Sequence, residues 1–244
     1  MAGFDSPTLT PTATIGGEQV ASTRLTVAGI PMDAGADGAL WVPGLRLLVV
    51  SDLHLEKGSS YARRGRFLPP YDTAATLARL EAAMARWNPQ TVIALGDSFH
   101  DVEAPDRLST AEGARLGRLA ANSRWIWIAG NHDPKINHTR SAAFGGEVMA
   151  EICTGGLTFR HEPHGKTAPG EIAGHFHPKT TVHTRLARFS GRCFVTDHAR
   201  LVMPAFGAFT GGLNIGDPAI RAHFPSGGFA HALIRGRIVA QSFT

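Results

Sequence analysis

The sequence contains few cysteines and no long hydrophobic run. Its 244 residues include only Cys153 and Cys193, which lie far apart and without the spacing of a metal site. This argues against a disulfide framework and a thiolate zinc site, so we expect both to be small core residues in a reducing compartment. No early apolar stretch resembles a signal peptide, and no later one reaches the length of a membrane span. We therefore expect a cytoplasmic protein without a membrane partner.

The net charge of the chain is small, and its sequence contains no internal repeat. The 24 Lys and Arg against 20 Asp and Glu leave a formal net charge of +4, with a sequence pI of about 9.5. That balance leans toward anionic partners such as nucleic acid, although solvated surface charge explains it equally well. Residues 1–22, rich in Thr, Pro, Gly and Ala, are typical of a disordered leader. Without repeats, residues 23–244 are predicted to form one domain.

Strand and helix patterns alternate in the first half of the chain. A helix is predicted at 72–87, where Leu77, Leu80, Met84 and Trp87 share one face, and another begins at the capping box Ser109-x-x-Glu112. Strands are predicted at 25–28, 39–42, 45–50, 91–95 and 125–129.

The second half is rich in short strand patterns separated by glycine and proline. They occur at 147–152, 157–160, 171–173, 181–184, 193–195, 201–203 and 234–240. An α/β half followed by a β-rich half predicts an α/β fold of the four-layer type. In such a fold two mixed β-sheets pack face to face and are flanked by helices.

Five short segments carry metal-ligand residue types. They are Asp52-Leu53-His54, Gly96-Asp97, Gly130-Asn131-His132-Asp133, His161 and Gly174-His175-Phe176-His177. The first three directly follow predicted strands, whose carboxyl ends meet at one rim of an open α/β sheet. Each segment alone is a weak motif, but together they indicate a two-metal site.

The donor types narrow the choice of metal. Oxygen and imidazole donors suit manganese, iron or zinc better than calcium, and manganese is our first expectation. Two such ions, about 3.5–4 Å apart, can hold an attacking hydroxide in line with a phosphoryl group. Asp97 is the natural bridging carboxylate.

The full set of motifs resembles the calcineurin-like metallophosphoesterase superfamily over residues 46–178. This resemblance implies the metallophosphoesterase fold and two ion sites, with Asp52, His54 and His177 on one ion, Asn131, His161 and His175 on the other, and Asp97 bridging. His161 stands alone after its strand, and His164 is an alternative three residues on. The remaining histidines are expected to be structural: His138, His183, His198, His223 and His231.

The same resemblance makes His132 a catalytic residue rather than a ligand. It would assist the leaving group when the bridging hydroxide attacks phosphorus, a task suited to a group that titrates near neutral pH. The phosphatase branch has a second aspartate three residues after the bridging one, which orients this histidine. Here that position is His100, followed by Asp101, so the orienting partner stays open.

A finer pattern resembles the bacterial ligase-associated DNA damage response endonucleases. It comprises Ser51 to Gly58, Gly96 to Asp101, Gly174 to Pro178 and the segment 201–214. The resemblance implies a manganese-dependent phosphodiesterase, an endonuclease acting on DNA in repair alongside a DNA ligase and a helicase. Segment 201–214 is expected to be a tight packing corner rather than a loop over the site, because its glycines permit close backbone approach.

Two basic stretches are candidates for nucleic-acid contact. Arg63, Arg64 and Arg66, beside Tyr61 and Phe67, form a predicted loop that could bind a phosphate backbone. Arg185, Arg188 and Arg192 form the second stretch. Either could equally be an ordinary solvated surface.

Two other functions are compatible with the motifs. One is a phosphatase or pyrophosphohydrolase for a small nucleotide; no amphipathic membrane-binding helix supports a lipid-linked substrate. The other is a catalytically silent scaffold with the same fold. A scaffold has no need of His132 beside a complete ligand set, which favours an enzyme.

Overall fold

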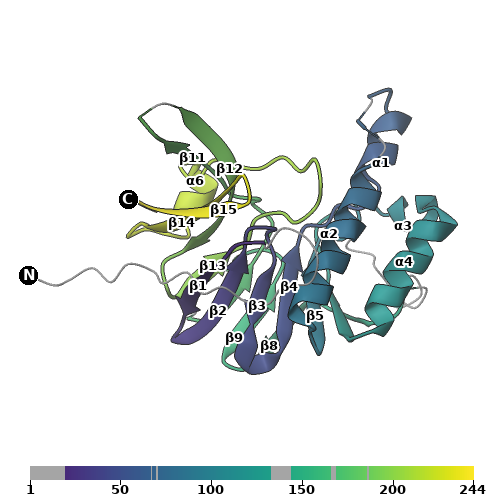
Figure 1. Cartoon of the computed structure of the whole chain (residues 1–244), viewed down its shortest axis with the longest axis horizontal. Coiled ribbons are helices and arrows are strands. Elements are labelled where there is room, and N and C mark those ends of the chain that lie inside the picture. The colour runs from purple at the N-terminus through teal and green to yellow at the C-terminus, as the bar shows by residue number, and fades with distance from the viewer. Residues whose placement is uncertain (1–19, 67, 70, 133–143, 166–168, 186) are drawn as a thin grey trace, which may run out of the picture.

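Two β-sheets packed face to face form the centre of the computed structural model (Figure 1). The structure describes residues 20–66, 68–69, 71–132, 144–165, 169–185 and 187–244. Most of the expected leader lies outside these residues, as do Phe67, Asp133 and His138.

The first sheet has seven strands, in the order in which they occur along the chain. Its strands are β1 (Ser22–Val27), β2 (Ile30–Gly35), β3 (Leu40–Val42), β4 (Leu47–Ser51), β5 (Thr91–Leu95), β6 (Arg124–Ile128) and β7 (Glu147–Met149). Strands β4 to β7 pair in parallel, whereas β1 to β4 pair antiparallel. The carboxyl ends of β4, β5 and β6 therefore lie at one edge.

The second sheet contains eight strands and is also mixed. The path runs β15-β14-β12-β13-β10-β9-β8, with β11 paired to β12 off the path. Its strands are β8 (Glu151–Thr154), β9 (Leu157–Arg160), β10 (Glu171–Ala173), β11 (Lys179–His183), β12 (Arg188–Thr196), β13 (Arg200–Val202), β14 (Gly228–Ile234) and β15 (Arg237–Phe243). Strand β10 runs parallel to both β9 and β13.

Helices cover the outer faces of both sheets. Within the described residues the α-helices are α1 (Lys57–Arg63), α2 (Asp72–Trp87), α3 (Ala104–Arg107), α4 (Thr110–Ala121) and α6 (Pro218–Arg221), and the 3-10 turn η1 (Pro43–Leu45) joins β3 to β4. Helices α2 and α4 pack on the first sheet and α6 packs on the second. Among the described residues, no helix is long and apolar enough to cross a membrane.

Strand β4 shows how the layers are held together. Leu47 and Val49 point into the apolar layer between the sheets, whereas Leu48 and Val50 pack against α2 and α4. All four are buried, and burying such a side chain contributes about 1.5–3 kcal/mol. A strand buried on both faces explains the continuous apolar run in the sequence. The predicted four-layer arrangement is confirmed.

Local predictions succeeded where periodicity was strong. Helix 72–87 and strands 91–95, 157–160 and 171–173 have the predicted bounds, and the Ser109–Glu112 capping box opens α4. The loop predicted after the first metal motif is wrong, because residues 57–63 form α1.

Two other predictions along the chain were wrong. The run 147–152 is divided between the sheets as β7 and β8, and 234–240 contains the turn of the β14–β15 hairpin. Arg235 and Gly236 both have positive φ there, as tight hairpin turns require. Cys193 is buried as expected, but Cys153 is exposed, so only one cysteine belongs to the core.

Candidate metal centre

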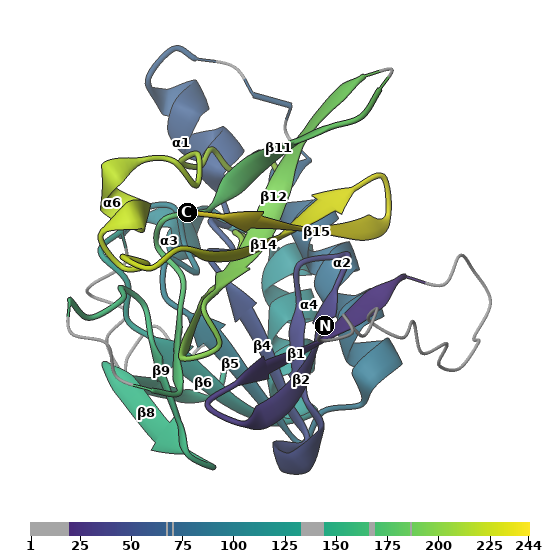
Figure 2. The same ribbon diagram turned by 90° about the vertical axis from the view of Figure 1, so that its left-hand side faces the viewer.

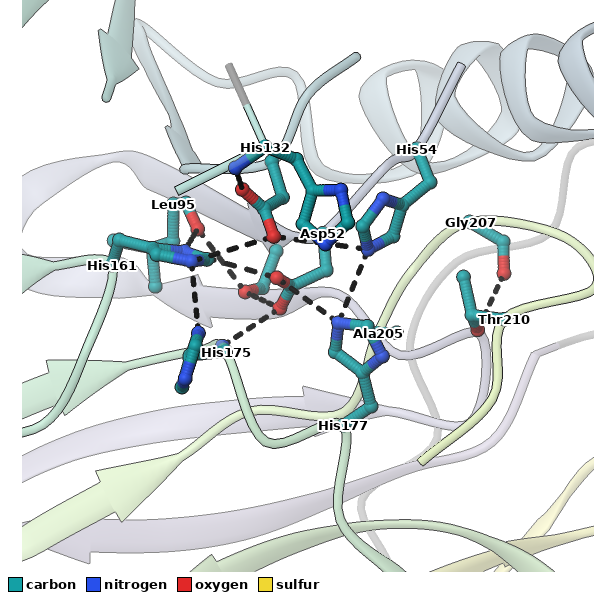
Figure 3. A network of polar contacts seen from close by, with 12 residues as sticks. Asp52, His54, Leu95, His132, His161, His175, His177, Ala205, Gly207 and Thr210 are labelled. Carbon is teal, nitrogen blue, oxygen red and sulfur yellow. Dashed lines mark hydrogen bonds and ion pairs between the residues drawn. The ribbon is translucent and has the colours of Figure 1, made fainter. Parts of the chain in front are cut away.

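The residues predicted as ligands converge at the carboxyl ends of strands from both sheets (Figure 3). Three donor segments follow strands of the first sheet, and two follow strands β9 and β10 of the second. The donors are Asp52 and His54 after β4, Asp97 after β5, Asn131 after β6, His161 after β9, and His175 and His177 after β10. The packing of the two sheets brings these segments together.

Asp52, His54 and His177 form one cluster of donors. Their ligand atoms all lie within 4.8 Å of one another. His177 Nε2 lies 3.2 Å from His54 Nε2 and 3.2 Å from Asp52 Oδ1. Asp52 and His54 are buried, whereas His177 is partly exposed. This geometry could hold one cation.

A second cluster is centred on His161. His161 Nε2 lies 2.9 Å from Asn131 Oδ1 and 3.2 Å from His175 Nδ1. The other ring nitrogen, Nδ1, lies 3.0 Å from the Leu95 carbonyl oxygen. Because a carbonyl only accepts hydrogen bonds, Nδ1 carries the proton and Nε2 presents its lone pair to the cluster. The structure therefore places His161 beside Asn131 and His175, whereas His164 donates its backbone N–H to Glu171.

Asp97 lies between the two clusters. Its Oδ2 is 3.5 Å from His161 Nε2 and 4.0 Å from His54 Nε2. Its Oδ1 accepts a hydrogen bond of 2.8 Å from the backbone N–H of His132. A carboxylate in this position can serve both clusters.

Burial and neighbouring charges set the protonation of the cluster formed by Asp52, His54 and His177. Burial lowers the pKa of His54 to about 2, so its ring is neutral. Burial would raise the pKa of Asp52, but the neighbouring histidines, His177 foremost, lower it to about 2, so the carboxylate is charged. Burial also disfavours protonated His177, yet the charge of Asp52 outweighs that effect and raises its pKa. His177 must therefore lose a proton to become a ligand.

Two features of the donor set fit the binding of divalent cations. Asp52 Oδ1 is buried and accepts no well-aligned hydrogen bond among the described residues, although His177 Nε2 lies 3.2 Å away. His161 Nε2 and Asn131 Oδ1 are both acceptors, yet they face each other. A cation between such atoms relieves their repulsion and the cost of the unpaired oxygen. The residues therefore fit divalent metal ions.

The backbone at the ligands adopts strained conformations. Positive φ occurs at Asp52, His54, Asp97, His175 and His177, with values from 43° to 71°. A non-glycine residue there costs on the order of 1–2 kcal/mol. Such strain typically concentrates at functional sites and is held by surrounding structure. The sequence contains no pattern that would have revealed it.

Glycines allow the late segment 201–214 to pack directly behind the ligands. A Cβ on Gly207 would lie 2.1 Å from the Leu53 carbonyl oxygen, and one on Gly212 would lie 2.0 Å from that of His177. Gly207 also donates its N–H to the Asp52 carbonyl. The segment thus has the close packing expected of a corner.

His132 lies at the exposed edge of the centre. Its ring meets the His54 ring edge-on, with centroids 5.2 Å apart, and stacks on His100 at 5.5 Å. His132 Nδ1 lies 3.0 Å from the backbone carbonyl oxygen of His100, so Nδ1 is the protonated donor. The contact that orients His132 is therefore a main-chain carbonyl.

Asp101 is engaged elsewhere. Both of its carboxylate oxygens accept hydrogen bonds from Arg107, at 2.9 and 2.8 Å. Burial would raise the pKa of Asp101, but the Arg107 hydrogen bonds outweigh it and lower the pKa. Asp101 thus shapes the loop that presents the His100 carbonyl instead of contacting His132.

The basic stretches are only partly available for nucleic acid. Arg63 forms an exposed ion pair with Glu103, whereas Arg64 and Arg66 are exposed. In the second stretch, Arg192 is wrongly predicted as a surface contact. It packs behind segment 201–214 and donates to the Ala205 carbonyl.

Arg185 and Arg188 are exposed on the β11–β12 hairpin. Figures 1 and 2 place this hairpin and α1 at the same end of the molecule.

One supporting pair behind the centre was missed in the sequence. Arg200 and Glu171 are each 1% exposed and form an ion pair at 2.9 Å. Arg200 also donates to the His164 carbonyl, and Glu171 accepts from the His164 N–H. The pair thereby anchors the turn that follows His161. Sequence reasoning could not find Arg200, since a single arginine in a short strand forms no distinctive pattern.

Comparisons with known proteins agree with this geometry. The family model of the calcineurin-like phosphoesterases matches residues 45–186. The crystal structure of the nuclease MPE from Pseudomonas putida is 30% identical, with a TM-score of 0.69, and the match covers 90% of this chain and 100% of that one. No curated protein matches the chain.

Two further solved structures are more distant. A protein of unknown function, AQ665 from Aquifex aeolicus, is 18% identical over 48% of this chain and 60% of its own, with a TM-score of 0.35. The phosphoesterase Yfce from E. coli is 13% identical over 81% of this chain and 99% of its own, with a TM-score of 0.39. Those TM-scores are too low to support an argument. The family match, which spans more than half of the sequence and all five donor segments, and the P. putida structure show that the chain belongs to the calcineurin-like metallophosphoesterases.

Proposed function

We propose that this phosphoesterase is a manganese-dependent phosphodiesterase that cleaves nucleic acid, with DNA as its substrate and endonucleolytic cleavage as its mode. The observation that carries the proposal is the convergence of seven residues with nitrogen and oxygen donors around Asp97, itself one of the seven, with the His132 ring at the exposed edge. Similarity to a structure described as a nuclease supports the substrate class.

The proposed ligands divide between two ions. One ion takes Asp52, His54 and His177, the second takes Asn131, His161 and His175, and Asp97 bridges them. Their donors are oxygens and imidazoles without a thiolate, which suits manganese, while iron and zinc fit the same donors. When bound, the two ions would supply a nucleophile at neutral pH and neutralise charge on the phosphoryl oxygens.

His132 is the proposed catalytic residue of the protein itself. Its Nδ1 is committed to the His100 carbonyl, which sets the ring orientation and leaves Nε2 as the atom that can exchange a proton with the substrate. Protonated Nε2 would donate its proton to the departing oxygen. General acid catalysis of this kind typically contributes about 10²–10⁴-fold in rate.

The decisive experiment measures hydrolysis by metal-stripped protein with and without added Mn²⁺. Its substrates are bis-p-nitrophenyl phosphate and labelled single-stranded DNA, and His132→Ala serves as the blank. Manganese-dependent cleavage of both substrates is the expected result. Cleavage of the small diester alone would instead favour a small-nucleotide substrate, and inactivity with Mn²⁺, Fe²⁺ and Zn²⁺ would favour a scaffold.

Two variants test the assigned roles separately. His132→Ala should keep two metal ions per chain but lose about 10²–10⁴-fold in turnover, because only proton transfer is removed. Asp97→Asn should lose metal and activity together, because the bridging charge is removed. Metal analysis of each purified variant beside its rate distinguishes the roles, and a fully active His132→Ala protein would contradict the catalytic assignment.

The cellular setting completes the proposal. We place the activity in the cytoplasm, in a DNA repair pathway with a DNA ligase and a helicase. The two free cysteines fit a reducing compartment. Co-purification of the chain with a ligase or helicase from its own cells would test the partnership.

A further inference from the structure

We propose that Lys57 and Lys179 form a phosphate-binding subsite beside the metal centre, for a phosphate next to the scissile one in a nucleic-acid strand. This inference rests on the proposed function, since it names how the substrate of that site is held. Lys57 lies in helix α1 and Lys179 in strand β11, and neither follows from the metal-binding motifs.

Both lysines follow proposed metal ligands closely in the chain. Lys57 opens α1, three residues after His54, and Lys179 opens β11, two residues after His177. The Nε2 atoms of those two histidines are 3.2 Å apart. The two lysines therefore begin elements that start beside neighbouring ligands, and Figure 2 shows α1 and β11 at the same end of the molecule.

Their positive charges also act on each other. Burial lowers the pKa of Lys57; the charge of Asp72 opposes this change, and the charge of Lys179 adds to it. Two like charges in a half-buried position repel each other, and a bound anion would relieve that repulsion.

The carboxylates near Lys57 have other partners. Glu56 is buried and accepts a hydrogen bond from Thr73, and Asp72 accepts one from the Gly58 N–H. Within the described part of the chain, no carboxylate lies at ion-pair distance from Lys57 or Lys179. Lys179 has only the Thr210 carbonyl, at 3.5 Å. The ammonium groups thus have donor capacity left for a ligand.

An aromatic surface adjoins the lysines. Lys57 Nζ lies 5.7 Å from the centroid of the Tyr61 ring, and that ring lies 5.7 Å from His100. A row of ammonium, phenol and imidazole beside a phosphoester site suits a nucleotide, whose phosphate binds lysine and whose base or sugar packs on an aromatic ring. A small phosphomonoester would leave this row unused.

The test adds one phosphate to a minimal substrate. Rates are measured with Mn²⁺ for the dinucleotide TpT, which has only the scissile phosphate, and for pTpT and TpTp, which carry one extra phosphate at either end. In the wild-type protein one of the extra phosphates should raise kcat/KM roughly tenfold, the effect of about one charged hydrogen bond. TpT provides the reference rate for every variant.

Each lysine is then changed singly. Lys57→Gln and Lys179→Gln should reduce that gain to about twofold or less, whereas Lys57→Arg, which retains the charge, should keep most of it. Arg118→Gln on the exposed face of α4 is the matched control for loss of a positive charge. A shallower dependence of kcat/KM on salt in the two glutamine variants should accompany the loss.

The outcomes separate this inference from the proposed function. If the wild-type protein cleaves TpT but gains nothing from either extra phosphate, or if the glutamine variants keep the full gain, the subsite is wrong and the nuclease proposal stands. If the wild-type protein cleaves bis-p-nitrophenyl phosphate but no nucleotide, the proposed function and the subsite are both wrong.

Discussion

Replacement of Gly96 by alanine should disable the metal centre through a single methyl group. Gly96 immediately precedes Asp97, the proposed bridging ligand, and has a φ of +69°. A Cβ at this position would lie 2.3 Å from His161 Nδ1 and 2.5 Å from its Cγ. The backbone at Gly96 and the His161 ring therefore cannot both keep their positions.

The expected magnitude follows from these distances. To reach ordinary contact at 3.4 Å, the His161 ring must move by about 1 Å, and a misplacement of that size can cost on the order of 10²-fold in rate. The move also breaks the hydrogen bond from Nδ1 to the Leu95 carbonyl, and loss of such a supporting bond typically weakens metal binding about 10–100-fold. Alanine at positive φ adds about 1–2 kcal/mol of strain.

The assay combines calorimetric titration of Mn²⁺ into metal-stripped protein with the rate of bis-p-nitrophenyl phosphate hydrolysis. Gly117→Ala is the matched control, because a Cβ there meets nothing within 4 Å and the residue lies inside α4. The control should gain about 0.5–1 kcal/mol in stability and leave metal binding and rate as in the wild type. Thermal unfolding of both variants shows whether they fold.

A folded Gly96→Ala protein that binds two Mn²⁺ ions with wild-type affinity and turns over at the wild-type rate would refute this reasoning. It would mean that His161 does not need its observed position, and therefore that it is not a ligand. The result bears on the donor for which the sequence offered the least support.

Three further predictions concern stability and reactivity. Arg107→Met should cost roughly 1–2 kcal/mol at neutral pH. Because the folded pKa of Asp101 is lowered, that contribution is present above its unfolded pKa of about 3.9 and declines as the pH falls below it; denaturant unfolding at several pH values measures this. Arg200→Met removes the shorter of the two ion pairs of buried Glu171, leaving the one with Arg160 at 3.5 Å, and should cost about 3 kcal/mol in the same assay. A thiol reagent should modify exposed Cys153 in the native protein and buried Cys193 only after denaturation.

Local sequence signals predicted the elements that depend on local interactions. The helix at 72–87 and the capping box of α4 follow from side chains within a few turns of each other. The division of 147–152 between two sheets could not be predicted in this way, because Ala150 carries no turn signal and the pairing partners of β7 and β8 are distant. The β14–β15 turn was missed since Arg235-Gly236 lacks the usual Asn or Asp.

The sequence by itself determined the donor types and their positions at strand ends, because both are local properties of the chain. Only the tertiary structure decided how donors from different sheets meet: His54 beside His177, and His161 beside Asn131. It also decided that the His100 main-chain carbonyl orients His132. Such contacts depend on how two sheets pack and on how a loop backbone is held. Neither can be predicted from the types of the residues that make the contact, because the packing is set by many residues elsewhere in the chain.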